Sequence, residues 1–290
     1  MTTIFHIHGG SGKHVAGASV IHSYKKRYPN KDIIVVSAYP EIFEGSPDVH
    51  RSYRIGQTPY FYRDFIHEKD IEVFGHDPYM TPSHISQQKG LIDSWCQLVG
   101  VDRLFSYQLN TNFREREFAG RLIGDNGNKK ILLFQPFGGP PNTELPYSWT
   151  RDIHPTTAQQ IVNNLANEYY IIHVCHPHHP ILDNVHRIDL SLQKRVLFAL
   201  LPLADKRLLI DSSLQHAAAA QNLPSTVAWI ATNPTVFGYD IHNNIVPQLT
   251  FREGTSASYL YDYNFGGDIL ECPYNHPEEI YSATEIISKL

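Results

Sequence analysis

The sequence contains little cysteine and no long apolar run. Three cysteines occur among the 290 residues, at Cys96, Cys175 and Cys272, too few and too dispersed for a disulfide framework. No apolar stretch approaches the roughly 20 residues that span a bilayer, and the first ten residues lack the basic and apolar regions of a secretory signal. We therefore expect a cytoplasmic protein without a transmembrane segment, in the host cytoplasm if the chain is viral.

An excess of positive charge is also missing. The chain has 24 Lys and Arg against 29 Asp and Glu, a formal net charge of −5. No general attraction to nucleic acid or anionic membranes is therefore expected, with the basic run Lys25–Arg27 as a local exception. Histidine and tyrosine are abundant instead, with 17 of each, and both side chains can line polar pockets that bind sugars or bases.

The N-terminal half alternates strand-like and helix-like segments. Ile4–Ile7, Asp32–Ser37 and Ile71–Phe74 are short apolar runs typical of buried strands. Val15–Tyr28 has helical spacing and ends in basic residues, and His84–Leu98 is amphipathic. Strands that alternate with helices in this way predict a parallel, doubly wound sheet.

A polar connector at residues 125–130 precedes a second series of the same kind. It predicts strands at 131–134, 169–174, 207–210, 226–230 and 266–271, and helices at 155–168, 215–221 and 277–289. The predicted fold class is α/β, with two Rossmann-like doubly wound domains facing a cleft. We place the N-terminal domain at 1–125, the C-terminal domain at 126–275 and a terminal helix at 276–290.

The stretch HGGSGKHVAG, residues 8–17, follows the first predicted strand. It is not a Walker A loop, because Ile7 and His14 stand where that loop needs a glycine and a Ser or Thr. Val15 likewise replaces the third glycine of a dinucleotide fingerprint. Glycines still let backbone N–H groups approach a ligand, and the N-terminus of the next helix favours negative charge. We therefore predict a phosphate- or substrate-binding loop formed by Gly9, Gly10, Ser11 and Gly12.

A second stretch, IDSSLQHAAAA at residues 210–220, predicts an anion site. A strand ends at Ile210, and Asp211-Ser212-Ser213 turns into an alanine-rich helix. Free N–H groups at the helix start and the two serine hydroxyls can bind a diphosphate. Such a site needs no metal, because the N–H groups and nearby cations carry the charge. A helix that is merely capped by serine is the structural alternative.

These motifs resemble a known family. GGSGKHVAGASV resembles the first glycine loop of two-domain GT-B glycosyltransferases. Residues 10–36 resemble the opening of the ADP-heptose:lipopolysaccharide heptosyltransferases, glycosyltransferase family 9, and residues 44–49 and 210–239 are similar to two further segments of that family. Within the last segment the residues in register with the family are Asp211, Ser212, His216, Pro224 and Pro234.

The resemblance implies an inverting, metal-independent glycosyltransferase without a cofactor. It would move a hexosyl, pentosyl or heptosyl group from a nucleoside-diphosphate sugar to a hydroxyl acceptor. The acceptor, a saccharide, a lipid-linked molecule or DNA, would lie over the first glycine loop. The residues expected to bind the donor are Asp211, Ser212, Ser213, Leu214, Gln215, His216, Arg151 and Gln135.

The resemblance also bears on the general base. In the family the base is an aspartate of the first loop, where this chain has Lys13. A charged lysine cannot accept a proton without a large downward shift of its pKa. We therefore predict His14 as the base, with Lys13 as its neighbour in contact with phosphate or acceptor. A helix-start histidine bonded only to backbone is the structural alternative, and the other candidate bases are Asp48, Asp64 and Asp77.

Three further functions stay open at this point. The chain could glycosylate a hydroxymethylated base in viral DNA, using a basic groove around Lys13 and Lys25–Arg27. It could be a nucleotide-sugar epimerase, or a nucleotide-sugar-binding protein without catalysis. The histidine-rich run His173–His179 could hold a metal or contact the nucleotide, and we assign no metal. The sequence leaves the oligomeric state undetermined.

Overall fold

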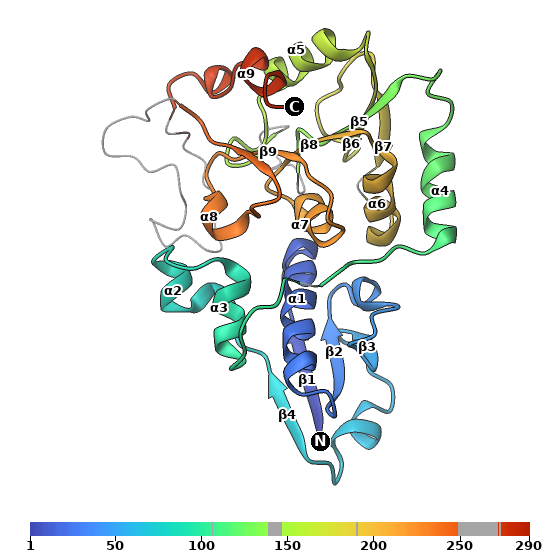
Figure 1. The fold of residues 1–290 in the computed structure, drawn as a ribbon, viewed down its shortest axis with the longest axis vertical. Helices are drawn as coiled ribbons and strands as arrows, with labels where there is room; N and C mark the ends of the chain where they lie inside the picture. The colour runs from blue at the N-terminus through green and yellow to red at the C-terminus, as the bar shows by residue number, and fades with distance from the viewer. Residues whose placement is uncertain (106, 139–146, 190, 249–271, 273) are drawn as a thin grey trace. The chain divides into compact units, whose positions relative to one another are not determined.

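The computed structural model describes residues 1–105, 107–138, 147–189, 191–248, 272 and 274–290. They form two compact units, Met1–Asn110 and Thr111–Leu290, each of which is described by itself (Figure 1). Each unit is built around a parallel sheet with helices packed on it. The predicted α/β class with two Rossmann-like domains is therefore confirmed.

The N-terminal unit contains a four-stranded sheet with the order β3-β2-β1-β4, in which all neighbouring strands are parallel. Its strands are β1 (Thr2–Ile7), β2 (Asp32–Ser37), β3 (Arg51–Arg54) and β4 (Ile71–Phe74). The central strands β1 and β2 are apolar and mostly buried, as expected for parallel strands covered on both faces. Because β1 and β4 are parallel neighbours, the loops that follow them leave the sheet at the same edge.

Helix α1 (Ser11–Arg27) follows β1 and packs on helix α3 (Leu91–Leu98). The two helices approach closely at Gly17, where an added Cβ would lie 2.9 Å from the Trp95 ring. The remaining helical segments of this unit are η1 (Pro40–Phe43), the π-helical turn η2 (Tyr62–Ile66), η3 (Pro78–Met80) and α2 (Pro82–Ile85).

The C-terminal unit contains a six-stranded parallel sheet with the order β10-β9-β8-β5-β6-β7. Its strands are β5 (Lys130–Phe134), β6 (Tyr169–Cys175), β7 (His186–Asp189), β8 (Lys206–Ile210), β9 (Thr226–Ala228) and β10 (Asn243–Ile245). The central β5 and β8 bring the segments after residues 134 and 210 to one edge. Two regions far apart in sequence thereby become neighbours.

Helices surround this second sheet. They are α4 (Phe113–Ile123), α5 (Pro155–Leu165), α6 (Lys194–Leu200), η4 (Leu201–Leu203), α7 (Ser213–Ala220), α8 (Pro234–Phe237), η5 (Pro277–Glu279) and α9 (Ala283–Ile287). The largest side chains in the core include Phe134, Phe137 and Trp229, all fully buried. Helix α7 contains four consecutive alanines, whose small side chains allow a helix to pack close to the sheet.

The two units divide before α4, whereas the polar connector at 125–130 placed the boundary after it. Helix α4 packs on α6 of the C-terminal unit. Arg195 Nε and Nη2 donate hydrogen bonds to the two carboxylate oxygens of Glu115 at 2.5 and 2.9 Å. This bidentate pair is largely buried and orients α4 on α6. Glu115 and Arg195 are 80 positions apart in the sequence. The composition of the connector therefore could not show that α4 belongs to the C-terminal unit.

Two predicted helices are interrupted. The helix expected at 84–98 is broken, because Gln87 has a φ of +56° and α3 begins only after Gly90. The helix expected at 277–289 is divided into η5 and α9, with the Ser282 hydroxyl capping the start of α9. Local backbone geometry and capping thus override the apolar spacing in both places. The strand expected at 266–271 lies outside the described residues.

Candidate functional site

The first candidate region lies at the carboxyl edge of the N-terminal sheet. The loop after β1 contains Gly9, whose φ of +94° favours glycine, and α1 begins at Ser11, earlier than the predicted Val15. Gly10 is the N-cap and no side chain caps the first turn. The first-turn N–H groups therefore have neither an intrahelical partner nor a side-chain cap, which suits an anion. The predicted glycine loop is thus a turn followed by a helix start.

Lys13 pairs with Asp77 at this edge. Lys13 Nζ lies 2.9 Å from Asp77 Oδ1, and its side chain is almost completely buried. The same ammonium group lies 4.8 Å from the centre of the Tyr79 ring. A small cavity of about 60 Å³ adjoins the pair, and its wall contains His8, His76 and Trp95. The loops after β1 and β4 thus combine a cation, a carboxylate and two exposed imidazoles.

His14 lies away from this cavity and is fully buried. Its Nδ1 is 2.9 Å from the Gly10 carbonyl oxygen, and its Nε2 is 3.2 Å from the Ile7 carbonyl oxygen. Burial lowers the pKa of His14, and the nearby charge of Lys13 acts in the same direction. A neutral ring donates to only one of these carbonyl oxygens, and its other nitrogen faces the second carbonyl oxygen rather than the cavity. The prediction that His14 is the base therefore does not fit its surroundings.

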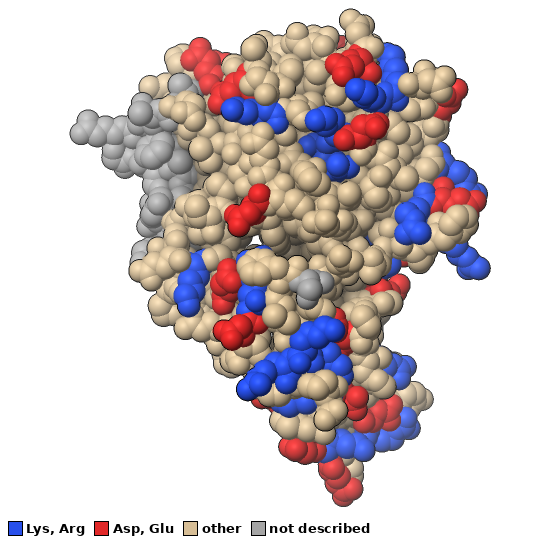
Figure 2. Space-filling model, viewed as in Figure 1, with Lys and Arg blue, Asp and Glu red and all other residues tan. Residues whose placement is uncertain are grey.

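Lys13 and the basic run Lys25–Arg27 do not form one basic surface on α1, as a DNA-binding groove around them would require. Lys13 stands in the first turn of α1 and Lys25–Arg27 in its last, about 18 Å apart along the helix axis. In Figure 2, Lys and Arg side chains gather over α1, and elsewhere on this face they are interspersed with Asp and Glu. Since Lys13 is buried and paired, it adds no charge to a surface that could bind DNA phosphates. The geometry gives no support to a DNA acceptor.

The second candidate region lies at the carboxyl edge of the C-terminal sheet. Ser212 Oγ donates a 2.6 Å hydrogen bond to Gln135 Oε1, which joins the segments after β8 and β5. The same hydroxyl accepts a hydrogen bond from Leu214 N at 3.2 Å and so caps α7. The structure therefore brings together two residues that the sequence assigned separately to donor binding.

The predicted donor residues differ in their exposure. Ser212 and Ser213 are partly exposed, so the turn is open to a ligand, whereas Asp211, Leu214, Gln215 and His216 are buried. Gln215 Nε2 donates to the Phe237 carbonyl oxygen at 3.1 Å. His216 Nδ1 lies 2.8 Å from the Tyr239 hydroxyl oxygen, and burial lowers the pKa of His216 to about 4. These two side chains hold α7 in place, whereas the two serines at its start are partly exposed.

Arg151 lies close to this turn. Its side chain is exposed, and its charge contributes to lowering the pKa of both Asp152 and His216. Asp152 is buried and accepts hydrogen bonds from Gly138 N at 3.0 Å and Ser148 N at 2.8 Å. Burial raises the pKa of Asp152 to about 7, against the effect of these hydrogen bonds. Asp152 thus fixes the turn that carries Arg151.

Sequence reasoning missed several of these contacts. Asp152, Tyr239 and His242 were not among the predicted site residues, although Asp152 is next to the predicted Arg151. The His242 Nε2 atom lies 2.9 Å from the Gln215 carbonyl oxygen. Asp77 was only one of three alternatives. The strand pattern could have identified Asp77, because Asp77 follows β4 and the glycine loop follows the parallel neighbour β1.

The histidine-rich run is mostly structural. His173 is fully buried between Phe134 and Phe137, and burial lowers its pKa to about 3. His179 Nδ1 accepts a hydrogen bond from His176 N at 3.0 Å. Across the described part of the chain, no three His, Cys, Asp or Glu side chains are grouped to hold a metal ion. The run after β6 therefore offers no metal centre within those residues.

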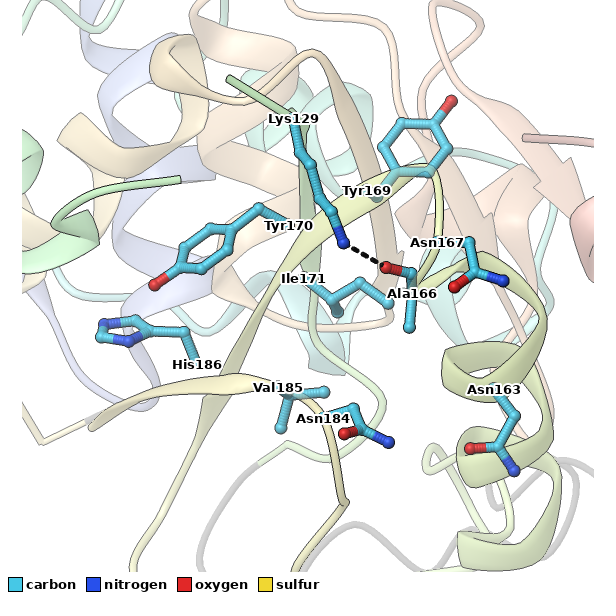
Figure 3. Close-up of a pocket in the computed structure, with 10 residues that line it drawn as sticks. All are labelled: Lys129, Asn163, Ala166, Asn167, Tyr169, Tyr170, Ile171, Asn184, Val185 and His186. Carbon is cyan, nitrogen blue, oxygen red and sulfur yellow. Dashed lines mark hydrogen bonds between the residues drawn. The ribbon is translucent and has the colours of Figure 1, made fainter. Parts of the chain in front are cut away.

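A larger cavity, about 660 Å³, lies at the opposite edge of the C-terminal sheet (Figure 3). Its wall contains Tyr169 at the start of β6 and His186 at the start of β7. Lys129, just before β5, donates to the Ala166 carbonyl oxygen at 2.8 Å across it. Open α/β sheets bind ligands at the carboxyl ends of their strands. We therefore do not include this cavity in the candidate site.

Comparison with known proteins gives similarity in structure but not in sequence. No protein-family model matches the chain, and no curated protein matches it. None of the helices in the described part of the chain combines the length and apolar character needed to cross a membrane.

Several solved structures are similar over nearly the whole chain. A glycosyltransferase family 9 protein from Veillonella parvula has a TM-score of 0.71 at 12% identity, covering 99% of this chain and 95% of that one. E. coli ADP-heptose LPS heptosyltransferase II has a TM-score of 0.65 at 13% identity, covering 99% of both. TibC of enterotoxigenic E. coli, a dodecameric iron-containing heptosyltransferase solved with ADP-D-beta-D-heptose, has a TM-score of 0.64 at 12% identity, covering 99% of this chain and 75% of that one. The chain therefore has the fold of the family 9 glycosyltransferases and the heptosyltransferases.

Proposed function

We propose that this chain is an inverting, metal-independent glycosyltransferase. It transfers a sugar from a nucleoside diphosphate, with an ADP-sugar as the first candidate donor, to a hydroxyl group of an acceptor. The donor diphosphate binds at the start of α7, and the acceptor hydroxyl is held at the carboxyl edge of the N-terminal sheet. The ADP-sugar is suggested by TibC, which was solved with ADP-heptose.

The open Ser212–Ser213 turn is the observation that carries this proposal. Ser212 and Ser213 are partly exposed at the start of α7, and the Ser212 hydroxyl is oriented by Gln135. N–H groups at a helix start and serine hydroxyls can bind a diphosphate. Arg151 adds a positive charge close by. Together they stabilise the charge that develops on the leaving diphosphate, the role that a metal ion has in other transferases.

Inversion follows from a single displacement. An acceptor oxygen that attacks the anomeric carbon opposite the diphosphate reverses the configuration there. The reaction then needs a base for the hydroxyl proton and stabilisation of the leaving group, without a covalent sugar–enzyme intermediate. The two candidate regions can supply these two requirements.

Donor binding can be tested with a panel of nucleotide sugars in a thermal-shift assay, followed by calorimetry. The panel contains ADP-heptose, ADP-glucose, UDP-glucose, UDP-N-acetylglucosamine and GDP-mannose. We expect one nucleotide class to raise the melting temperature and to bind equally well in EDTA. The proposal is wrong if no member of the panel binds, and metal independence is wrong if EDTA abolishes transfer.

A matched pair of serine variants locates the site. Ser212→Ala and Ser282→Ala each remove the hydroxyl that caps a helix of the C-terminal unit, α7 or α9. Both should cost roughly 1 kcal/mol of stability. Donor affinity should fall about tenfold in Ser212→Ala only, because Ser282 has no part in the proposed site. Equal donor affinity in the two variants would place the diphosphate elsewhere.

A further inference from the structure

Asp77 lies at the carboxyl edge of the N-terminal sheet and lines the small cavity there. It follows β4, whose Phe74 pairs with Phe5 of the parallel neighbour β1. The chain after β4 therefore runs beside the glycine loop, and the Asp77 carboxylate lines the small cavity there. Its side chain is 43% exposed, so a substrate hydroxyl can reach it.

The Asp77 carboxylate is held in one orientation. Oδ1 lies 2.9 Å from Lys13 Nζ and accepts a hydrogen bond from Tyr79 N at 3.0 Å. Oδ2 has no hydrogen-bond partner among the residues that the structure describes. One oxygen is thus fixed by two donors while the other stays open to accept a proton. A preoriented base of this kind lowers the entropic cost of reaching the reactive geometry.

The other candidate bases are less well placed. His14 is buried with both ring nitrogens against carbonyl oxygens. Asp48 is buried and pairs with His22 at 2.8 Å. Asp64 pairs with the exposed Arg63 and does not line the cavity.

We propose that Asp77 is the general base of the transfer reaction and that Lys13 is its positioning residue. This inference rests on the proposed function. Asp77 Oδ2 removes the proton from the acceptor hydroxyl as the acceptor oxygen forms a bond to the anomeric carbon. The bond between that carbon and the diphosphate oxygen breaks, and the nucleoside diphosphate leaves with the bonding electron pair. The proton ends on Asp77 and passes to solvent after the product departs.

This arrangement accounts for the lysine in the first loop. The resembling family has an acidic residue there, whereas this chain has Lys13 and places the carboxylate 2.9 Å away on the adjacent strand's loop. Cation and carboxylate therefore occupy one small region, although the strands that supply them differ. A comparison of first loops alone identifies the lysine and overlooks its partner.

The test compares Asp77→Asn with Asp93→Asn. Asp93 is a matched control in the same unit, because it is 41% exposed and pairs with Arg103 at 3.2 Å. The probe is ADP-heptose. Turnover is measured as the release of ADP when water accepts the sugar, and nucleotide binding is measured by calorimetry with ADP. We expect Asp77→Asn to lower turnover by about 10²–10⁴-fold with the ADP dissociation constant unchanged within about twofold. Asp93→Asn should keep wild-type turnover.

Each other outcome has a definite meaning. Wild-type turnover in Asp77→Asn overturns the base assignment and leaves the proposed function intact. Loss of ADP binding in Asp77→Asn makes Asp77 a donor contact and also overturns the assignment. A wild-type protein that neither binds nor turns over any donor of the panel removes the proposed function and this inference with it.

A second comparison tests Lys13. Lys13→Gln should lower turnover about tenfold or more while ADP binding is retained, because Asp77 loses the charge that orients it. Lys13→Arg should restore much of this loss, which a purely structural role would not predict, since a bulkier side chain fits a buried site less well. Equal turnover in Lys13→Gln and the wild type would overturn the positioning role.

Discussion

Ser212 donates a 2.6 Å hydrogen bond to Gln135 and thereby joins the segments after β8 and β5. The bond fixes the Ser212 hydroxyl at the start of α7, where the hydroxyl also accepts a hydrogen bond from Leu214 N at 3.2 Å. Gln135 is almost fully buried, so it acts through Ser212. The proposed donor region therefore depends on a residue that is itself almost fully buried.

Gln135→Leu should weaken donor binding by about 5–20-fold, because the Ser212 hydroxyl loses its acceptor and turns freely. Calorimetry with the donor measures the effect. Gln221→Leu is the control, since Gln221 ends the same helix and donates to the Phe198 carbonyl oxygen at 3.0 Å. If both variants bind the donor as the wild type does, the Gln135–Ser212 bond has no part in recognition.

His14→Ala should reduce stability more than catalysis. The variant leaves a void and removes the ring N–H that donates to a backbone carbonyl oxygen, which we expect to lower the free energy of unfolding by about 2–4 kcal/mol. Turnover of the folded protein should change by less than about tenfold. Urea unfolding and an ADP-release assay measure the two effects. A large loss of turnover at unchanged stability would restore His14 as the base.

His173 should make the protein sensitive to acid. Its pKa is lowered by burial to about 3, whereas an unfolded histidine titrates near 6.5. A lowered pKa means that this contribution to stability is complete above pH 6.5 and is lost as the pH falls. Between pH 7 and pH 5 the loss from this residue is about 2 kcal/mol.

Replacing the ring by leucine tests that contribution. His173→Leu should match or exceed wild-type stability at pH 7, because both ring nitrogens are buried without a hydrogen-bond partner among the described residues. It should lose about 2 kcal/mol less than the wild type between pH 7 and pH 5. The exposed His178 supplies the control, His178→Leu. Equal losses in all three proteins, measured by urea unfolding, would contradict the assignment.

Two helical glycines should respond in opposite directions to alanine. At Gly17 an added Cβ would lie 2.9 Å from the Trp95 ring and 3.0 Å from Ile7 Cδ1, so Gly17→Ala should cost about 1–3 kcal/mol. Gly120, in α4, has open space around it, and Gly120→Ala should add roughly 0.5–1 kcal/mol. Urea unfolding distinguishes them, and a gain in stability for Gly17→Ala would show that α1 and α3 can move apart freely.

The sequence by itself determined the class of fold and the place of both loops. Apolar runs such as Asp32–Ser37 and the serine turn before the alanine-rich α7 are local patterns, set by neighbours within a few turns of chain. Local sequence therefore determines the strands of the parallel sheet and the serine-capped start of α7, where we propose that the diphosphate binds. The resemblance to family 9 glycosyltransferases could be recognised from the sequence because it also rests on local motifs, at residues 10–36, 44–49 and 210–239.

Only the tertiary structure decided which side chains of those loops can act. Burial keeps His14 away from the cavity. Strand order places Asp77 beside Lys13, although Asp77 lies 64 positions later in the sequence. Likewise the Glu115–Arg195 pair assigned α4 to the C-terminal unit. Exposure and ion pairing depend on which distant segments become neighbours, and that choice comes from the packing of the whole sheet rather than from local spacing.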